Sequence, residues 1–235
     1  EPEPYTRVNL GLATPDSSWT GVAYNAFKDE GNDAGGKKFF GEINLWLQNG
    51  ASWTNEAWGE PPDAYFGEDF SESHLKRLVG GESADKVGHI FQKPGEDEDS
   101  EGINIRVDDY KGFTNVYYGH KDEKPTDILG GTFTVTKAQP GSGINLITDS
   151  KGLNVDSSKA ADKNLASETL NALANKLFYT AYKNGETNLA GKVEIAEGLT
   201  SSSLSKRMED ITFKESNGQG QYLYTPASDI PEEQT

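Results

Sequence analysis

Two adjacent carboxylates, Asp108 and Asp109, are the residues of this sequence whose types best fit catalytic chemistry. They follow the alternating segment 103–107, and enzymes that cleave polysaccharides use paired carboxylic acids. Neighbouring residues of a strand point to opposite faces, so these acids would act together only at a bend. A catalytic pair and a solvated turn therefore both remain open, and we assign no catalytic residue.

Other groups that could do chemistry are scattered. The three histidines, His74, His89 and His120, stand 15 and 31 residues apart, without the close spacing typical of a zinc site. The acidic run 96–99 carries oxygen ligands suited to calcium, yet it lacks the spacing of an ordered calcium loop and fits a solvated charge run. No Gly-x-Ser-x-Gly motif is present. We expect no metal site and no cofactor.

One aromatic segment is the best candidate for recognition. Exposed rings stack on sugar faces and anchor protein interfaces. The candidate ligand-binding residues are Trp58, Tyr65, Phe66 and Phe70. The competing interpretation is that this loop folds back and buries its rings. The other tryptophans, Trp19, Trp46 and Trp53, lie in or beside strand-like segments, and we interpret them as packing residues.

The elements that must position these groups are short strands. The segment Ser18-Trp19-Thr20 recurs as Ser52-Trp53-Thr54, 34 residues later, and an alternating segment 43–47 followed by Asn49-Gly50 precedes the second copy. Similar alternation recurs along the chain between glycine-rich turns. An imperfect repeat of this kind favours a β-solenoid, in which each rung needs a neighbour to cover its edge. A sandwich or jelly roll also fits short strands.

One segment has helical periodicity. Leucines and alanines of residues 158–184 fall on one helical face, with residues 156–158 as N-caps and Asn184-Gly185 as a stop signal. We predict a long α-helix over 158–184 that packs on the outside of the solenoid. The loop insertions are expected at 56–72 and 93–102.

Composition restricts the function classes. The formal net charge of −16 opposes binding to phosphate backbones, so we exclude nucleic acid as a partner. The chain has no cysteine, which rules out disulfides and thiolate metal sites. No apolar run reaches the ~20 residues of a membrane span. Both ends have the composition of polar linkers, so a fragment of a longer protein is expected.

Several segments resemble the passenger regions of Gram-negative autotransporters. They are residues 18–22, 43–53, 130–135, 166–182 and 193–200. The resemblance implies an all-β, right-handed parallel β-helix displayed by a C-terminal membrane barrel, which this chain does not include. It also implies an extracellular location on the outer membrane surface or release from it. The predicted helix departs from the simplest passengers, which are all-β.

The functions of that family divide among adhesion, self-association, proteolysis and esterase activity, and the motifs of both enzyme classes are missing here. We therefore expect residues 1–235 to form a single β-solenoid passenger fragment that acts as an adhesin without catalysis. Its partner would be a host or bacterial surface protein or glycan, with self-association as a further option. A carbohydrate-active β-helix enzyme (polysaccharide lyase or glycosidase) and a structural stalk are the alternatives.

Overall fold

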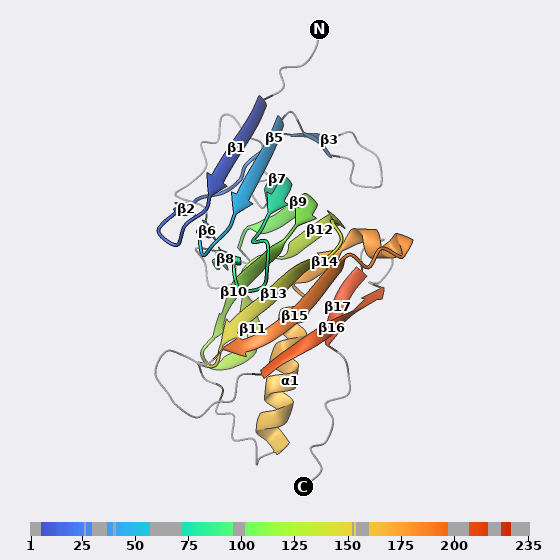
Figure 1. Ribbon diagram of the computed structural model, residues 1–235. Helices are drawn as coiled ribbons and strands as arrows, with labels where there is room; N and C mark the ends of the chain where they lie inside the picture. Colours follow the sequence, from blue (N-terminus) through green and yellow to red (C-terminus); the bar gives the residue numbers. More distant parts are fainter. Residues whose placement is uncertain are drawn as a thin grey trace.

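Parallel β-strands dominate the computed structural model (Figure 1). It describes residues 6–25, 27–29, 37–39, 41–56, 72–95, 102–151, 153, 160–196, 207–215 and 222–226. The predicted predominance of short strands is confirmed. The candidate residues Trp58, Tyr65, Phe66 and Phe70 and the acidic run 96–99 lie outside the described residues, as does most of the two predicted loop insertions.

The strands form two parallel stacks. The first stack has the order β1 (Thr6–Leu12), β5 (Gly41–Leu47), β7 (Glu72–Val79), β9 (Asn104–Lys111), β12 (Phe133–Ala138) and β14 (Leu177–Tyr179). The second stack has the order β2 (Ser18–Thr20), β6 (Ser52–Asn55), β8 (Gly88–Gln92), β10 (Phe113–Lys121), β13 (Ser142–Asp149) and β15 (Leu189–Ala196). The chain therefore visits the two stacks in alternation.

Shorter pieces complete the sheet arrangement. β11 (Lys124–Leu129) pairs antiparallel with β10, and β3 (Phe27–Asp29) pairs antiparallel with β4 (Lys37–Phe39). At the C-terminal end, β16 (Arg207–Glu215) runs antiparallel to β15, and β17 (Tyr222–Pro226) joins β16 to β14. This antiparallel pair connects the last strands of both stacks and covers their edges, which would otherwise be open to pairing.

The core is built from aligned apolar rows. In the second stack Trp53 pairs with Ile90, Ile90 with Val116, and Val116 with Leu146, and all four side chains are fully buried. In the first stack Leu45, Leu78 and Tyr110 form a corresponding row. One hydrophobic cluster contains both rows, so the two stacks share a core. This continuity follows because the strands of both rows turn apolar side chains toward the same interior.

The helix is shorter than predicted. α1 spans Ala160–Ala174, and residues 177–184 of the predicted helical segment form β14 and the 3-10 helix η1 (Thr180–Asn184). Leu177 and Tyr179 are fully buried beside β12, because this leucine-aromatic segment completes the first stack by pairing there. The predicted stop holds at the end of η1, where Gly185 adopts φ 79°.

Helix α1 lies near the C-terminal end of both stacks. It packs against β11, β13, β15 and β17 and lies at the same end of the molecule as β16 (Figure 1). Its side chains Ala166, Leu170, Leu173 and Ala174 are buried and belong to the shared core. The apolar face predicted from the sequence is therefore the face that α1 buries. Among the described residues, no helix is long and apolar enough to cross a membrane.

Candidate functional site

Three neighbouring strands of the first stack share a break in the alternation of buried and exposed residues. In β7 two consecutive outward residues, Lys76 and Arg77, separate the buried Leu75 from the buried Leu78. We call such a pair of consecutive outward residues an outward step. β9 has an outward step at Asp108-Asp109, and β12 has one at Thr136-Lys137. The steps are aligned, since Arg77 pairs with Asp109 and Asp109 with Lys137. Alternation alone would turn one residue of each pair inward, so the break brings charged side chains to one face.

Both carboxylates of this step have cationic or polar partners. The Oδ1 atom of Asp108 lies 3.0 Å from His74 Nε2, and its Oδ2 atom lies 3.7 Å from Lys76 Nζ. The Oδ2 atom of Asp109 lies 3.5 Å from Arg77 Nε, and its Oδ1 atom accepts a hydrogen bond of 3.1 Å from Gln139 Nε2. The two acids therefore have separate partners, although the broken alternation turns both outward.

This geometry answers the question left open by the sequence. The interpretation of Asp108-Asp109 as a solvated turn is wrong, because β9 continues through both residues. Both side chains are nevertheless turned outward, although adjacent residues of a strand normally point to opposite faces. Each acid is in contact with basic side chains of its own, so the two carboxylates do not converge as a catalytic pair.

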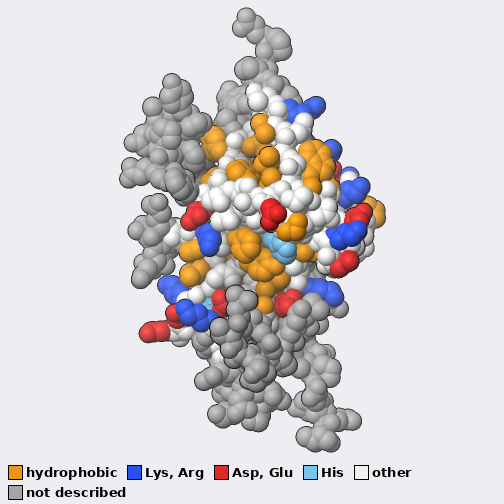
Figure 2. All heavy atoms as spheres, turned by 60° about the vertical axis from the view of Figure 1, so that its left-hand side comes forward, with side chains coloured by type: hydrophobic (Ala, Val, Ile, Leu, Met, Phe, Trp, Pro, Cys, Tyr) orange, Lys and Arg blue, Asp and Glu red, His pale blue; other side chains and the backbone are white. Residues whose placement is uncertain are grey.

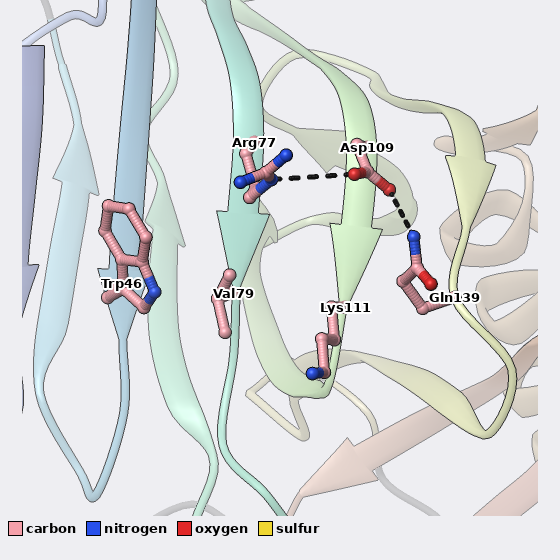
Figure 3. Close-up of a pocket in the computed structure, with 6 residues that line it drawn as sticks. All are labelled: Trp46, Arg77, Val79, Asp109, Lys111 and Gln139. Atoms are coloured by element: carbon pink, nitrogen blue, oxygen red, sulfur yellow. Dashed lines mark hydrogen bonds and ion pairs between the residues drawn. The ribbon is translucent and has the colours of Figure 1, made fainter.

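The side chains around Asp109 line a hollow of about 350 Å³ on the outer face of the first stack. Its lining residues are Trp46, Arg77, Val79, Asp109, Lys111 and Gln139. Figure 3 shows them arranged across β5, β7 and β9 to the end of β12, with the ion pair and the amide contact drawn at Asp109. The hollow thus combines an indole, a cation-rich wall and an amide.

Trp46 supplies the aromatic side of this hollow. It stands level with Val79, which stands level with Lys111, because these residues are register partners on successive strands. On its other side Trp46 pairs with Gly11, where an added Cβ would meet no atom within 4 Å. A glycine neighbour leaves one side of the indole open, so the ring can accept the apolar face of a sugar.

Trp46 does not belong to the shared core, unlike Trp53, so its interpretation as a packing residue is not confirmed. Its neighbours Leu45 and Leu47 are fully buried, and Trp46 is only half-buried. The signal was present in the alternation, which puts Trp46 on the face opposite the two leucines. The roles of Arg77, Lys111 and Gln139 had no comparable signal, because their proximity comes from register between strands about 30 residues apart in sequence.

The three histidines have separate environments. Nδ1 of the buried His74 accepts a hydrogen bond of 3.1 Å from Asn25 Nδ2, so Nε2 carries the proton donated to Asp108. In His120 both ring nitrogens face acceptors, with Nδ1 3.1 Å from Lys121 O and Nε2 2.9 Å from Asp149 Oδ1. Within the described residues, no three histidine or acidic side chains gather as metal ligands would.

His89 belongs to an aromatic cluster on the second stack. Its Nδ1 lies 2.9 Å from Tyr117 Oη, and the Tyr117 ring stacks on Phe91 at a centroid distance of 4.8 Å. Phe91 is 36% exposed. Burial lowers the pKa of His89 below its ordinary value of 6.5. In Figure 2 hydrophobic side chains gather beside a histidine, and charged side chains surround them.

Comparisons of the chain with protein families, with curated proteins and with solved structures find no match. The chemistry of the two outer faces therefore has to indicate the function. The hollow of the first stack is concave and contains charged, amide and aromatic groups together, as binding sites commonly do. For this reason it is the candidate functional site.

Proposed function

We propose that the two stacks are the walls of a right-handed parallel β-helix. The alternation of the chain between the stacks supports this, because each return adds one parallel strand beside the previous one. Parallel strands joined by a crossover are right-handed in about 98% of cases, which supports the hand. The antiparallel pair β16–β17 and helix α1 would then close the C-terminal end of the β-helix, as terminal caps do in repeat folds.

The chain would act as an adhesin that binds glycans at the hollow beside Trp46 without catalysis. The observation that carries this proposal is the combination of a half-buried indole with Arg77, Asp109, Lys111 and Gln139 around one hollow. Sugar rings offer apolar faces to aromatic rings and hydroxyls to charged and amide groups. Shallow sites across the strands of an elongated face suit binding of an extended chain.

The cellular location that we propose follows from the resemblance to autotransporter passenger regions. The chain would be a passenger region, displayed on the outer membrane surface of a Gram-negative bacterium by a C-terminal barrel or released from it. Its ligand would be a glycan of a host or of a neighbouring bacterial cell.

A second candidate function is polysaccharide cleavage. It is favoured by the outward position of Asp109 inside the hollow, beside Arg77. Two-carboxylate cleavage of a glycoside needs two acids whose oxygens are both free to act on one substrate. Asp109 is instead in contact with a guanidinium and an amide, and Asp108 with an imidazole and an ammonium. Binding without cleavage is therefore the better-supported function.

The experiment is binding of the purified chain to a glycan array, with wild type compared against Trp46→Ala. Phe91→Ala is the matched control, since it removes an exposed aromatic ring from the second stack. Circular dichroism verifies that both variants fold. Saturable binding that Trp46→Ala abolishes and Phe91→Ala retains supports the proposal.

Two other outcomes would contradict this function. New reducing ends or unsaturated sugars released from a bound polysaccharide would identify an enzyme instead. No binding to any glycan would reject the glycan site and leave a structural stalk as the better explanation.

A further inference from the structure

We infer that the hollow beside Trp46 selects anionic oligosaccharides that carry carboxylates, such as chains of uronic acids. This inference rests on the proposed glycan-binding function and names its ligand class. The charge around the hollow, which is opposite in sign to that of the whole chain, supports this ligand class. The formal net charge of the chain is −16, yet the outward step and the hollow present four cationic side chains against two carboxylates. The four cations are Lys76, Arg77, Lys111 and Lys137, and the carboxylates are Asp108 and Asp109.

Among the described residues, the other charged side chains on this outer face form ion pairs. Arg7 pairs with Glu42 on β1 and β5, and Arg106 Nε lies 3.0 Å from Glu72 Oε1 on β9 and β7. Within the described part of the first stack, the surplus of positive charge therefore lies at the level of the hollow. A local reversal of sign on an acidic protein attracts anions to that place and repels them elsewhere.

Two of the four cations have no ionic or hydrogen-bonding partner among the described residues. Within the described part of the chain, neither Lys111 nor Lys137 has a recorded ion pair or side-chain hydrogen bond, whereas Lys76 and Arg77 share the two acids. Lys111 lies in the wall of the hollow and is exposed. It can therefore pair with a carboxylate of the ligand without first losing a partner in the protein.

The carboxylate in the hollow does not cancel this attraction. Both oxygens of Asp109 have partners, since Arg77 Nε faces Oδ2 and Gln139 Nε2 donates to Oδ1. Lys137 is also the register partner of Asp109 on β12. The charge of Asp109 is thereby largely compensated, and its main effect is to fix the side chains of Arg77 and Gln139 at the edge of the hollow.

Spacing indicates a ligand longer than one sugar. Trp46, Val79 and Lys111 stand on three successive strands at the same level. Adjacent strands lie about 4.8 Å apart, so Trp46 and Lys111 are separated by about 10 Å along the stack. A pyranose ring stacked on Trp46 would leave its own carboxylate short of Lys111. An oligosaccharide that runs across the strands would bring the carboxylate of the next residue to Lys111.

The test is calorimetric titration with oligosaccharides of galacturonate, of alginate and of hyaluronan, each compared with its own methyl ester. A heparin oligosaccharide of equal length provides the sulfated arm. The variants are Trp46→Ala and the double variant Lys111→Met/Lys137→Met. The control is Lys124→Met, which removes a lysine paired with Asp127 on β11.

At least one carboxylated oligosaccharide should bind, and its methyl ester should bind at least about tenfold more weakly. Because exposed ion pairs are individually weak, the double lysine variant should weaken binding by about three- to tenfold, and Lys124→Met should not change it. Raising the ionic strength should weaken the wild-type complex and have little effect on the remaining binding of the double variant.

The inference fails if acid and ester bind equally, or if the heparin oligosaccharide alone binds. It also fails if no charged oligosaccharide binds while a neutral glycan binds in a Trp46-dependent manner. This last result would leave the glycan-binding function intact. If no glycan of any charge binds, both proposals are wrong.

Discussion

The indole rings of Trp19 and Trp53 lie nearly parallel, with centroids 5.2 Å apart and an angle of 8° between their planes. The two residues are register partners on β2 and β6, between the partner pairs Ser18–Ser52 and Thr20–Thr54. The repeated Ser-Trp-Thr segment of the sequence is therefore one structural position occupied in two successive strands. Trp53 also donates a hydrogen bond of 2.9 Å from Nε1 to Gly21 O.

Trp53→Ala should destabilise the protein severely. The side chain is fully buried, and its removal leaves a cavity beside Trp19 together with an unpaired carbonyl at Gly21. Replacement of a buried large aromatic residue by alanine costs about 3–5 kcal/mol of the free energy of unfolding. Urea denaturation followed by tryptophan fluorescence measures this loss.

Trp46→Ala is the control for this change, because the same chemical deletion is made at a half-buried position. It should cost much less stability than Trp53→Ala. Equal losses for the two variants would contradict the assignment of Trp53 to the core and Trp46 to the surface.

Gly88→Ala should be destabilising although Gly88 has no unusual backbone angle. A Cβ there would lie 2.7 Å from the Leu47 Cγ atom and closer still to the Leu47 carbonyl oxygen. Such overpacking typically costs about 1–3 kcal/mol. The matched control is Gly119→Ala on β10, where a Cβ would meet nothing within 4 Å. Thermal unfolding of both variants should show a lower midpoint for Gly88→Ala alone; a similar loss in Gly119→Ala would indicate a general strand effect.

The sequence predicted those parts of the molecule that depend on local patterns. Alternation located the segment 43–47 inside β5, and the 34-residue repeat marked Ser18 and Ser52 as the starts of two equivalent strand segments. The buried face of α1 was also visible from its leucines. The C-terminal limit of α1 was not, because the residues of β14 have helical spacing and are drawn into the stack only by pairing with β12.

The candidate site was largely beyond prediction for the same reason. Asp108 and Asp109 attracted attention as neighbours, yet the partners that define their chemistry come from other strands. Lys76-Arg77 and Asp108-Asp109 face each other only because β7 and β9 break their alternation at the same level. A single sequence contains no signal for that alignment, whereas the outward position of Trp46 could have been read from Leu45 and Leu47.

His89 should make the stability depend on pH in mildly acidic solution. Its folded-state pKa is lowered by burial, so the unfolded chain binds the proton more readily than the folded chain. The stabilising contribution of neutral His89 is therefore complete above the unfolded-state pKa of about 6.5 and is lost as the pH falls through and below that value.

The measurement is urea denaturation of wild type and His89→Gln between about pH 8 and pH 5. Other titrating groups contribute equally to both proteins, so the difference between their unfolding free energies isolates His89. That difference should shift in favour of His89→Gln as the pH falls. A difference independent of pH would show that His89 ionises alike in the folded and unfolded chains.

Tyr110 should link stability to pH at the alkaline end. Its hydroxyl donates to Gly143 O at 2.7 Å and lies 2.6 Å from Thr114 Oγ1, and its burial raises the pKa far above the ordinary value of 10. The unfolded chain ionises first, so the stability contributed by protonated Tyr110 is fully present below about pH 10 and is lost above it. At neutral pH, Tyr110→Phe should cost about 1–3 kcal/mol of the free energy of unfolding because Gly143 O loses its donor.

Urea denaturation from neutral to alkaline pH should show this cost shrinking as the pH rises past 10, with tyrosinate absorbance appearing together with unfolding. Phe133→Leu, a change at a buried residue without an ionisable group, provides the reference with a constant cost. A constant cost for Tyr110→Phe as well, or tyrosinate absorbance from Tyr110 in the folded protein, would contradict its burial in the shared core.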